Sequence, residues 1–140
     1  GAYIAERGKG PFQNHFITFS GNPELVEFNG IDNLFNGAAR ERVSNIFQTL
    51  LYSMMLNRTE GCESMPSLYF ASKMLSDDYS PKILNRANNE YVERYSDYAQ
   101  DFEQQLSSVF EELFDIDTPF KQAEDVDACT YCDFKTICRR

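Results

Sequence analysis

Residues 40–57 constrain the fold of this chain most strongly, because their apolar side chains recur at the spacing of an α-helix. The apolar positions of this stretch are Val43, Ile46, Phe47, Leu50, Leu51, Met54 and Met55. Spacings of three, four, seven and eight residues put them on one face of a helix. A helix with one wide apolar face needs another layer of structure to cover that face. The pattern therefore predicts a layered globular domain.

The rest of the chain supplies the other layers. Residues 2–38 are predicted to form a strand pair and a loop, and the aromatic stretch 66–73 is predicted to be a buried strand. A brief helix is expected to start at Pro81, and a second long helix is expected over 89–114. The second helix carries the stripe Tyr91, Tyr95, Tyr98, Phe102, Leu106, Val109 and Leu113. The predicted fold class is α/β (α+β): a small sheet, two long helices packed on it, and an irregular cysteine-rich tail over 119–140.

The composition indicates the class of protein. With 140 residues, of which 42% are hydrophobic, we expect a single domain over 1–140. No apolar run reaches the roughly 18 residues of a membrane span, and no charged-then-apolar leader is present, so we expect a cytoplasmic protein. The net charge of -9 gives no general attraction to nucleic acid, although much of the negative charge lies on the second long helix. Gly1 is expected to be a remnant of cloning or cleavage, which predicts that the chain is part of a longer protein.

Three cysteines near the C-terminus form the strongest local signal. Cys129 and Cys132 make a C-x2-C pair, and Cys138 follows six residues later. Such a pair puts two thiolates on one tight turn, and soft thiolate ligands suit zinc or an iron–sulfur cluster. Both centres usually take four ligands, and Cys62 and His15 are the candidates for the fourth. The alternative is three ordinary thiols, or a disulfide, near a frayed end.

A pair of polar residues marks the first long helix. Gln48 and Tyr52 are four residues apart and share one face beside the apolar stripe. Both side chains can hydrogen-bond to a phosphate or a carboxylate. The simpler interpretation is that they form the rim of the core. His15 is the chain's single histidine, so a His-based catalytic triad is not expected.

Together, the polar pair and the cysteine tail resemble the C-terminal part of a PD-(D/E)XK nuclease domain of the RecB/AddB-like type, found in helicase–nucleases of DNA repair and recombination. The residues that carry the resemblance are Phe47 to Tyr52, Pro119 to Gln122, and the C-x2-C-x5-C run with Phe134 and Ile137. The resemblance covers roughly residues 3–140. It implies a restriction-endonuclease-like core, a Q-x-x-x-Y helix made by Gln48 and Tyr52, and a [4Fe–4S] cluster on the tail cysteines. It also implies DNA, and a helicase or other protein, as partners, and Mg²⁺ or Mn²⁺ in an active member.

The catalytic positions of that family are changed in this chain. The family has an Asp on its first strand and an Asp/Glu-x-Lys on its second strand, directly before a Gly turn. The corresponding positions here are Ala5, Ile17 and Phe19, with Gly21 as the turn. A divalent metal ion needs carboxylate oxygens, which these side chains lack. The resemblance therefore implies a truncated or degenerate domain without intact catalytic residues; the family's first cluster cysteine, upstream of the nuclease core, is also missing.

Two functions from different classes remain open. The first is a nuclease-superfamily domain that holds DNA or a partner through its sheet and the helix with Gln48, without cleaving DNA. The second is a metal-stapled protein-interaction module with no nucleic-acid role, which the acidic charge and the aromatic second helix favour. Those aromatic residues would also be explained if they simply fill the core. No P-loop, nucleophile elbow or dinucleotide fingerprint indicates an enzyme of another class.

Overall fold

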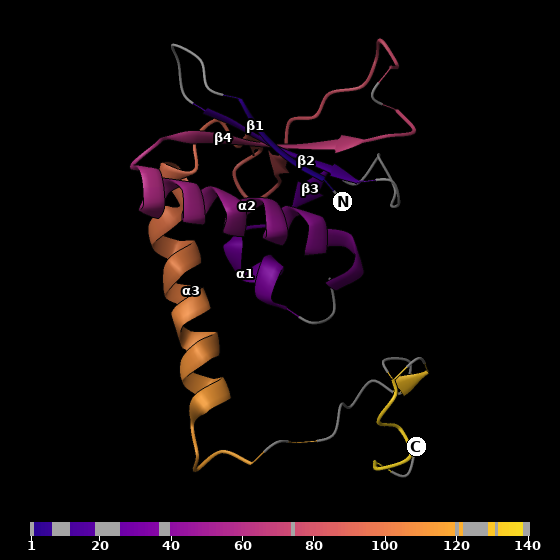
Figure 1. The fold of residues 1–140 in the computed structure, drawn as a ribbon, viewed down its shortest axis with the longest axis vertical. Coiled ribbons are helices and arrows are strands. Elements are labelled where there is room, and N and C mark those ends of the chain that lie inside the picture. Colours follow the sequence, from indigo (N-terminus) through magenta and orange to yellow (C-terminus); the bar gives the residue numbers. More distant parts are fainter. Residues whose placement is uncertain are drawn as a thin grey trace. The chain divides into compact units, whose positions relative to one another are not determined.

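The structure, a computed structural model, describes residues 2–6, 12–18, 26–36, 40–73, 75–119, 121, 129–130 and 132–138. The helices and strands in chain order are β1 (Ala2–Glu6), β2 (Phe12–Thr18), β3 (Glu27–Phe28), α1 (Ile31–Phe35), α2 (Arg40–Glu60), β4 (Ser64–Phe70), β5 (Leu84–Asn85), β6 (Glu90–Tyr91) and α3 (Ser96–Phe114), as Figure 1 shows. The chain divides into two units, Gly1–Ser107 and Ser108–Arg140. The boundary falls within α3.

The first sheet has the strand order β1-β2-β4. β1 and β2 form an antiparallel pair in which Tyr3 is opposite Phe16, and β2 runs parallel to β4 with Phe16 opposite Leu68. Parallel neighbours need a long crossover connection, and α2 lies within that connection, across one face of the sheet (Figure 1). The predicted α/β fold class, with a strand pair, a crossover helix and a further strand, is confirmed.

The face of α2 that packs on the sheet is made of apolar and small polar side chains. Val43, Ile46 and Leu50 are buried. Thr49 and Ser53 of the same helix are also fully buried. The Thr49 hydroxyl donates to the carbonyl of Asn45 at 2.8 Å, and the Ser53 hydroxyl donates to the carbonyl of Thr49 at 3.0 Å. These bonds within the helix satisfy the hydroxyls, so two short side chains can face the sheet without the cost of a buried unpaired polar group.

The ends of the two central elements differ slightly from the sequence prediction. α2 continues to Glu60, three residues past the predicted end, and its last part leaves Met55 exposed although the pattern placed it on the apolar face. Gly61 ends the helix with φ +65°, a left-handed conformation that glycine adopts without steric cost, and its N–H donates to the carbonyl of Asn57 at 3.0 Å. The strand predicted over 66–73 is β4, which begins at Ser64 and ends at Phe70.

A second small sheet, β3-β5-β6, lies where the sequence predicted a helix from Pro81. That prediction is wrong, because the backbone after Pro81 pairs instead: β5 runs parallel to β3 and antiparallel to β6. The buried side chain of Asn85 accepts hydrogen bonds from the N–H groups of Gly30 at 3.0 Å and Ala87 at 3.1 Å. Asn85 therefore joins the start of α1 to the β5–β6 turn.

The second long helix starts seven residues later than predicted. α3 begins at Ser96, and the preceding residues form strand β6 and the turn before it, in which Asn89 has φ +58°. Tyr91 continues the helical spacing of the Tyr95 stripe, but it belongs to β6 and is half exposed. Pairing with β5 satisfies the backbone of β6, and this tertiary pairing overrides the local pattern.

Aromatic side chains fill the core, as the simplest interpretation of the sequence proposed. Phe35 of α1, Phe47 of α2 and Phe102 of α3 contact one another, with ring centroids 5.4–5.6 Å apart. Phe102 and Tyr95 are completely buried. In contrast, Val109 and Leu113, which extend the same stripe into the second unit, are exposed.

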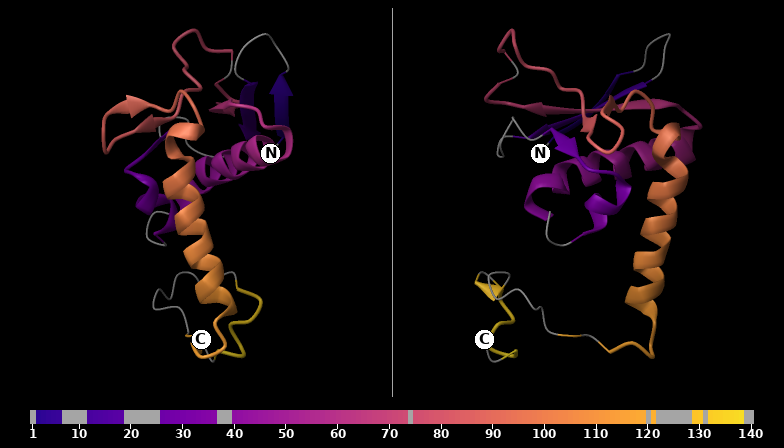
Figure 2. Two further views of the ribbon diagram at one scale, coloured as in Figure 1. Left: turned by 90° about the vertical axis from the view of Figure 1, so that its left-hand side faces the viewer. Right: turned by 180° about the vertical axis from the view of Figure 1, so that it is seen from behind.

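Of the helices in the described ranges, none is long and apolar enough to cross a membrane. The predicted single domain and cytoplasmic location stay predictions. Figure 2 shows the described elements from two further sides.

Candidate functional site

The carboxyl ends of β2 and β4 meet at one edge of the first sheet, where Thr18 pairs with Phe70. In open α/β sheets, ligands bind in the crevice outside the carboxyl ends of the strands. The chain segment that follows β4 is attached to this strand by Tyr79. The Tyr79 hydroxyl donates to the carbonyl of Leu68 at 2.6 Å and accepts from the N–H of Phe70 at 3.2 Å. Burial raises the pKa of Tyr79, so the hydroxyl remains a donor at neutral pH.

A pocket of about 400 Å³ lies between this segment and the second sheet. Its lining residues are Val26, Glu27, Lys73, Ser76, Asp78, Tyr79, Ser80, Lys82, Leu84 and Tyr91. We call it the lysine pocket. The Lys82 ammonium lies 2.8 Å from a carboxylate oxygen of Glu93 and 5.7 Å from the centre of the Tyr91 ring. The hydrogen bond to Glu93 raises the pKa of Lys82, so Lys82 is protonated and positively charged at neutral pH.

The two lysines of the lysine pocket differ in their surroundings. Lys82 is paired with Glu93, whereas Lys73 is exposed and no ion pair joins it to another described residue. The pocket also contains two carboxylates, Glu27 and Asp78, and Glu27 is paired with Arg86 at 2.6 Å. Lys73 is therefore the cation in this pocket that is best placed to accept an anionic ligand.

The catalytic positions expected from the family pattern are not neighbours in the sheet. Ala5 of β1 pairs with Asn14 of β2, whereas Ile17 pairs with Ala2 on one side and Tyr69 on the other. Ile17 is thus three residues from the partner of Ala5, roughly 10 Å along the ladder. Phe19 and Gly21 lie outside the described residues. His15 lies within β2, where it pairs with Ile4 and Ser67.

The two residues of the Q-x-x-x-Y motif have different environments on α2. Gln48 is exposed, and Tyr52 is half buried and packs against the core. Tyr52 thus fits the interpretation of a core rim, while Gln48 is available to a ligand. The role of the pair at a site stays a prediction.

The tail cysteines lie on a series of tight turns. The N–H of Cys132 donates to the carbonyl of Cys129 at 3.2 Å, and the N–H of Cys138 donates to the carbonyl of Phe134 at 3.3 Å. The four cysteines, all within the described ranges, are not joined in disulfides and are partly accessible. Cys62 belongs to the first unit, just after α2, where its thiol donates to the carbonyl of Glu60 at 3.3 Å.

The chemistry of these thiols fits zinc or an iron–sulfur cluster, because both prefer thiolate ligands. Their positions do not form a complete site: among the side chains of the described ranges, no three His, Cys, Asp or Glu residues gather in a way that could hold a metal ion. Metal binding by Cys129, Cys132 and Cys138, with Cys62 as a fourth ligand, stays a prediction.

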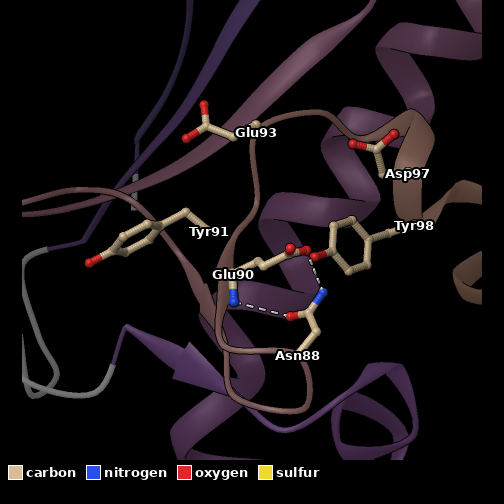
Figure 3. A pocket seen from close by; sticks show the side chains of 6 residues that line it. All are labelled: Asn88, Glu90, Tyr91, Glu93, Asp97 and Tyr98. Carbon is tan, nitrogen blue, oxygen red and sulfur yellow. Dashed lines mark hydrogen bonds between the residues drawn. The ribbon is translucent and has the colours of Figure 1, made fainter.

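A second pocket, of about 500 Å³, is formed by β6 and the residues on either side of it in the chain, and it is acidic (Figure 3). Its lining residues are Asn88, Glu90, Tyr91, Glu93, Asp97 and Tyr98. The Asn88 amide donates to Glu90 at 3.0 Å, and Figure 3 shows Tyr98 pointing toward this pair while the Tyr91 ring points away. The lining residues of this pocket include three carboxylates and no Lys or Arg, so of these two pockets the lysine pocket suits an anion better.

Neither pocket was found from the sequence. Both are built from short strands and loops that are brought together by the second sheet. The lysines and tyrosines of the lysine pocket are scattered between Lys73 and Tyr91 without a recognisable spacing. Only the interleaving of basic and aromatic residues in that stretch could have indicated them.

Comparison with known families gives one match. The sequence model of the PD-(D/E)XK nuclease superfamily matches residues 33–139. This range contains α2 with Gln48 and Tyr52, β4, α3 and all three tail cysteines. It begins after β1 and β2, the strands on which the family's catalytic residues were expected. No curated protein and no solved structure is similar enough to this chain to match.

Proposed function

Because this chain belongs to the PD-(D/E)XK nuclease superfamily, we propose that it is a DNA-binding domain of the RecB/AddB-like type that does not itself cleave DNA. The observation that carries the proposal is the superfamily match over the Q-x-x-x-Y helix and the cysteine tail, combined with the absence of an acid-x-Lys sequence at Ile17. The domain would act in a cytoplasmic helicase–nuclease of DNA repair or recombination.

The lysine pocket is the part of the described surface that best fits a DNA strand. It lies beside the carboxyl end of β4, where ligands of α/β sheets bind. Lys73 would contact a backbone phosphate, and the exposed ring of Tyr91 would stack on a base. The overall charge of -9 does not prevent this, because much of it lies on α3 and local charge decides where a strand sits.

The tail would be held in place by a metal centre. Cys129, Cys132 and Cys138 would supply thiolate ligands to zinc or a [4Fe–4S] cluster, and Cys62 would complete the set. When bound, such a centre contributes stability to the segment that it crosslinks.

A salt titration of DNA binding tests the proposal. The full chain is titrated onto fluorescently labelled single-stranded and double-stranded DNA at several salt concentrations, with anisotropy as the readout. We expect binding that weakens steeply with salt, and a salt slope reduced by about one for Lys73→Ala. Arg94→Ala is the matched control, because Arg94 is an exposed cation paired with Asp97 outside the lysine pocket. Absence of binding at every salt concentration would refute the proposal.

A digestion assay tests the absence of cleavage separately. Linear DNA is incubated with the chain and Mg²⁺ or Mn²⁺, next to an active nuclease of the same superfamily. We expect intact DNA. Robust cleavage that is lost on Gln48→Ala would show instead that the chain has a working active site.

The second candidate function is a metal-stapled protein-interaction module without a nucleic-acid role. The acidic pocket and the exposed apolar residues at the end of α3 favour it. The salt titration separates the two functions, since a module of this kind would show no DNA binding at any salt concentration.

A further inference from the structure

The end of α3 and the turn after it expose several large apolar side chains that are close together in the sequence. Their exposed fractions are 43% for Val109, 50% for Phe110, 49% for Leu113, 75% for Phe114 and 96% for Ile116. Single exposed apolar residues are ordinary, but a contiguous apolar patch is typical of an interaction site. We call these residues the α3 apolar face.

The α3 apolar face is ordered as two parallel rows along the helix. Val109 and Leu113 are four residues apart, and so are Phe110 and Phe114. The rings of Phe110 and Phe114 lie nearly parallel, with centroids 6.4 Å apart and 19° between their planes. The two rows therefore form a broad surface, as wide as one face of a second helix.

A groove of about 380 Å³ runs beside the first row. It is lined by Val109, Glu112, Leu113, Thr118, Pro119 and Lys121. The turn that forms one wall is held by Asp115, which accepts hydrogen bonds from the Thr118 hydroxyl at 2.6 Å and from the N–H of Asp117 at 3.0 Å. A fixed wall beside an apolar row can receive the side chains of a partner.

The charges around the α3 apolar face are predominantly negative, and Lys121 in the lining of the groove is the exception among the residues named above. Residues 108–119 contain Glu111, Glu112, Asp115 and Asp117 and no Lys or Arg. The last turn of α3 also has no basic residue. Because the C-terminal end of a helix carries a negative partial charge, acidic residues there are unfavourable until a cation approaches.

We infer that the α3 apolar face is a docking surface for a basic amphipathic helix of a partner protein. The apolar side of such a helix, with anchors at positions i, i+3, i+4 and i+7, would cover the two rows. Its flanking Lys and Arg residues would lie against Glu111, Glu112 and Asp115. A second copy of this chain is a poor occupant, because it would bring the same acidic residues against themselves.

Peptide binding to the full chain tests the inference. The probes are two labelled amphipathic peptides of about 18 residues, with the same Leu face but flanked by Lys in one and by Glu in the other. We expect the Lys peptide to bind and Phe110→Ser with Phe114→Ser to weaken it about tenfold or more. Glu111→Lys with Glu112→Lys should reverse the preference toward the Glu peptide. Met55→Ser is the matched control, since Met55 is about as exposed as Phe110 but lies on α2.

Three outcomes would overturn the inference. The first is equal binding of both peptides, or binding that neither double variant changes. The second is a dimer in sedimentation equilibrium that Phe110→Ser with Phe114→Ser dissociates, because a second copy would then occupy the face. The third is peptide binding that appears only in Phe134→Ser with Ile137→Ser, because the exposed apolar residues of the chain's own tail would then be the occupant.

Discussion

Glu63 joins the start of α3 to the start of β4 by accepting two backbone hydrogen bonds. Its Oε1 atom accepts from the N–H of Ser96, the first residue of α3, at 3.2 Å and from the N–H of Ser64 at 3.1 Å. The N–H of Tyr95 donates to the carbonyl of Ser64 at 2.9 Å in the same junction. A carboxylate at this place satisfies an N–H that has no partner within the helix. Its negative charge also interacts favourably with the positive end of the helix dipole.

The Glu63 junction predicts a pH-dependent part of the stability. Burial raises the pKa of Glu63, but hydrogen bonds from Ser96 and Ser64, together with Arg94, outweigh burial and leave the pKa below its usual value. A pKa that is lower in the folded state gives stability that is present above the unfolded pKa and is lost as the pH falls through the folded pKa.

We therefore predict that Glu63→Ala lowers the free energy of unfolding by about 1 kcal/mol at neutral pH, and that this difference shrinks below about pH 4. Urea unfolding at a series of pH values measures it. Glu93→Ala is the control, because Glu93 forms only an exposed ion pair with Lys82 and should cost under about 0.5 kcal/mol. A difference for Glu63→Ala that is constant down to pH 3 would contradict the assignment.

The two hydrogen bonds of the Tyr79 hydroxyl predict that this residue stabilises the outer edge of β4. Its hydroxyl contacts the carbonyl of Leu68 and the N–H of Phe70, so Tyr79→Phe leaves both groups without that partner. We expect a loss of about 1–2 kcal/mol in the free energy of unfolding and faster hydrogen exchange of the Phe70 amide. Tyr91→Phe removes the hydroxyl of an exposed tyrosine in the second sheet and should change neither quantity. Unchanged exchange at Phe70 in Tyr79→Phe would refute the role of the hydroxyl.

The sequence allowed α2 to be predicted because its pattern is long and periodic. Val43, Ile46 and Leu50 are buried as their spacing implied, since 18 residues of helical period leave few alternatives. The start of α3 could not be predicted in this way. Tyr91 and Tyr95 have helical spacing, yet Tyr91 lies in β6 and Tyr95 directly precedes the first residue of α3. Strands of two residues have no period to detect, and pairing across the chain creates them.

The candidate site was less predictable than the fold. Gln48 and the tail cysteines could be proposed as site residues because a fixed local spacing carries them, and the superfamily match includes both positions. The lysine pocket depends on Glu27, Lys73 and Tyr91 meeting in space, and these residues are far apart in the sequence. Tertiary proximity of this kind leaves no local spacing, so beyond the mixture of basic and aromatic residues between Lys73 and Tyr91 only the structure could show it.

The burial of Phe102 predicts how much the aromatic core contributes to the stability of the fold. It is completely buried and contacts Phe35 and Phe47, whereas Phe114 on the same helix is 75% exposed. Phe102→Ala removes a buried ring and leaves a cavity, so we expect a loss of about 3–5 kcal/mol. Phe114→Ala should cost less than about 0.5 kcal/mol. Thermal or urea unfolding of the two variants compares them directly, and equal losses would show that Phe102 is not a core residue in solution.

The spacing of the tail cysteines predicts that the chain binds a metal centre through thiolate ligands. We expect the chain purified without oxygen to contain zinc, or iron with sulfide and broad visible absorption, in elemental analysis. Cys132→Ser should lose that metal, because it removes the middle ligand of the C-x2-C-x5-C run. Cys62→Ser distinguishes the ligand sets: loss of metal makes Cys62 the fourth ligand, and retention means that a group other than Cys62 completes the site. A metal-free wild-type chain, or metal retained by Cys132→Ser, would exclude the assignment, since a site that has only weak or nonspecific ligands would not depend on one thiolate.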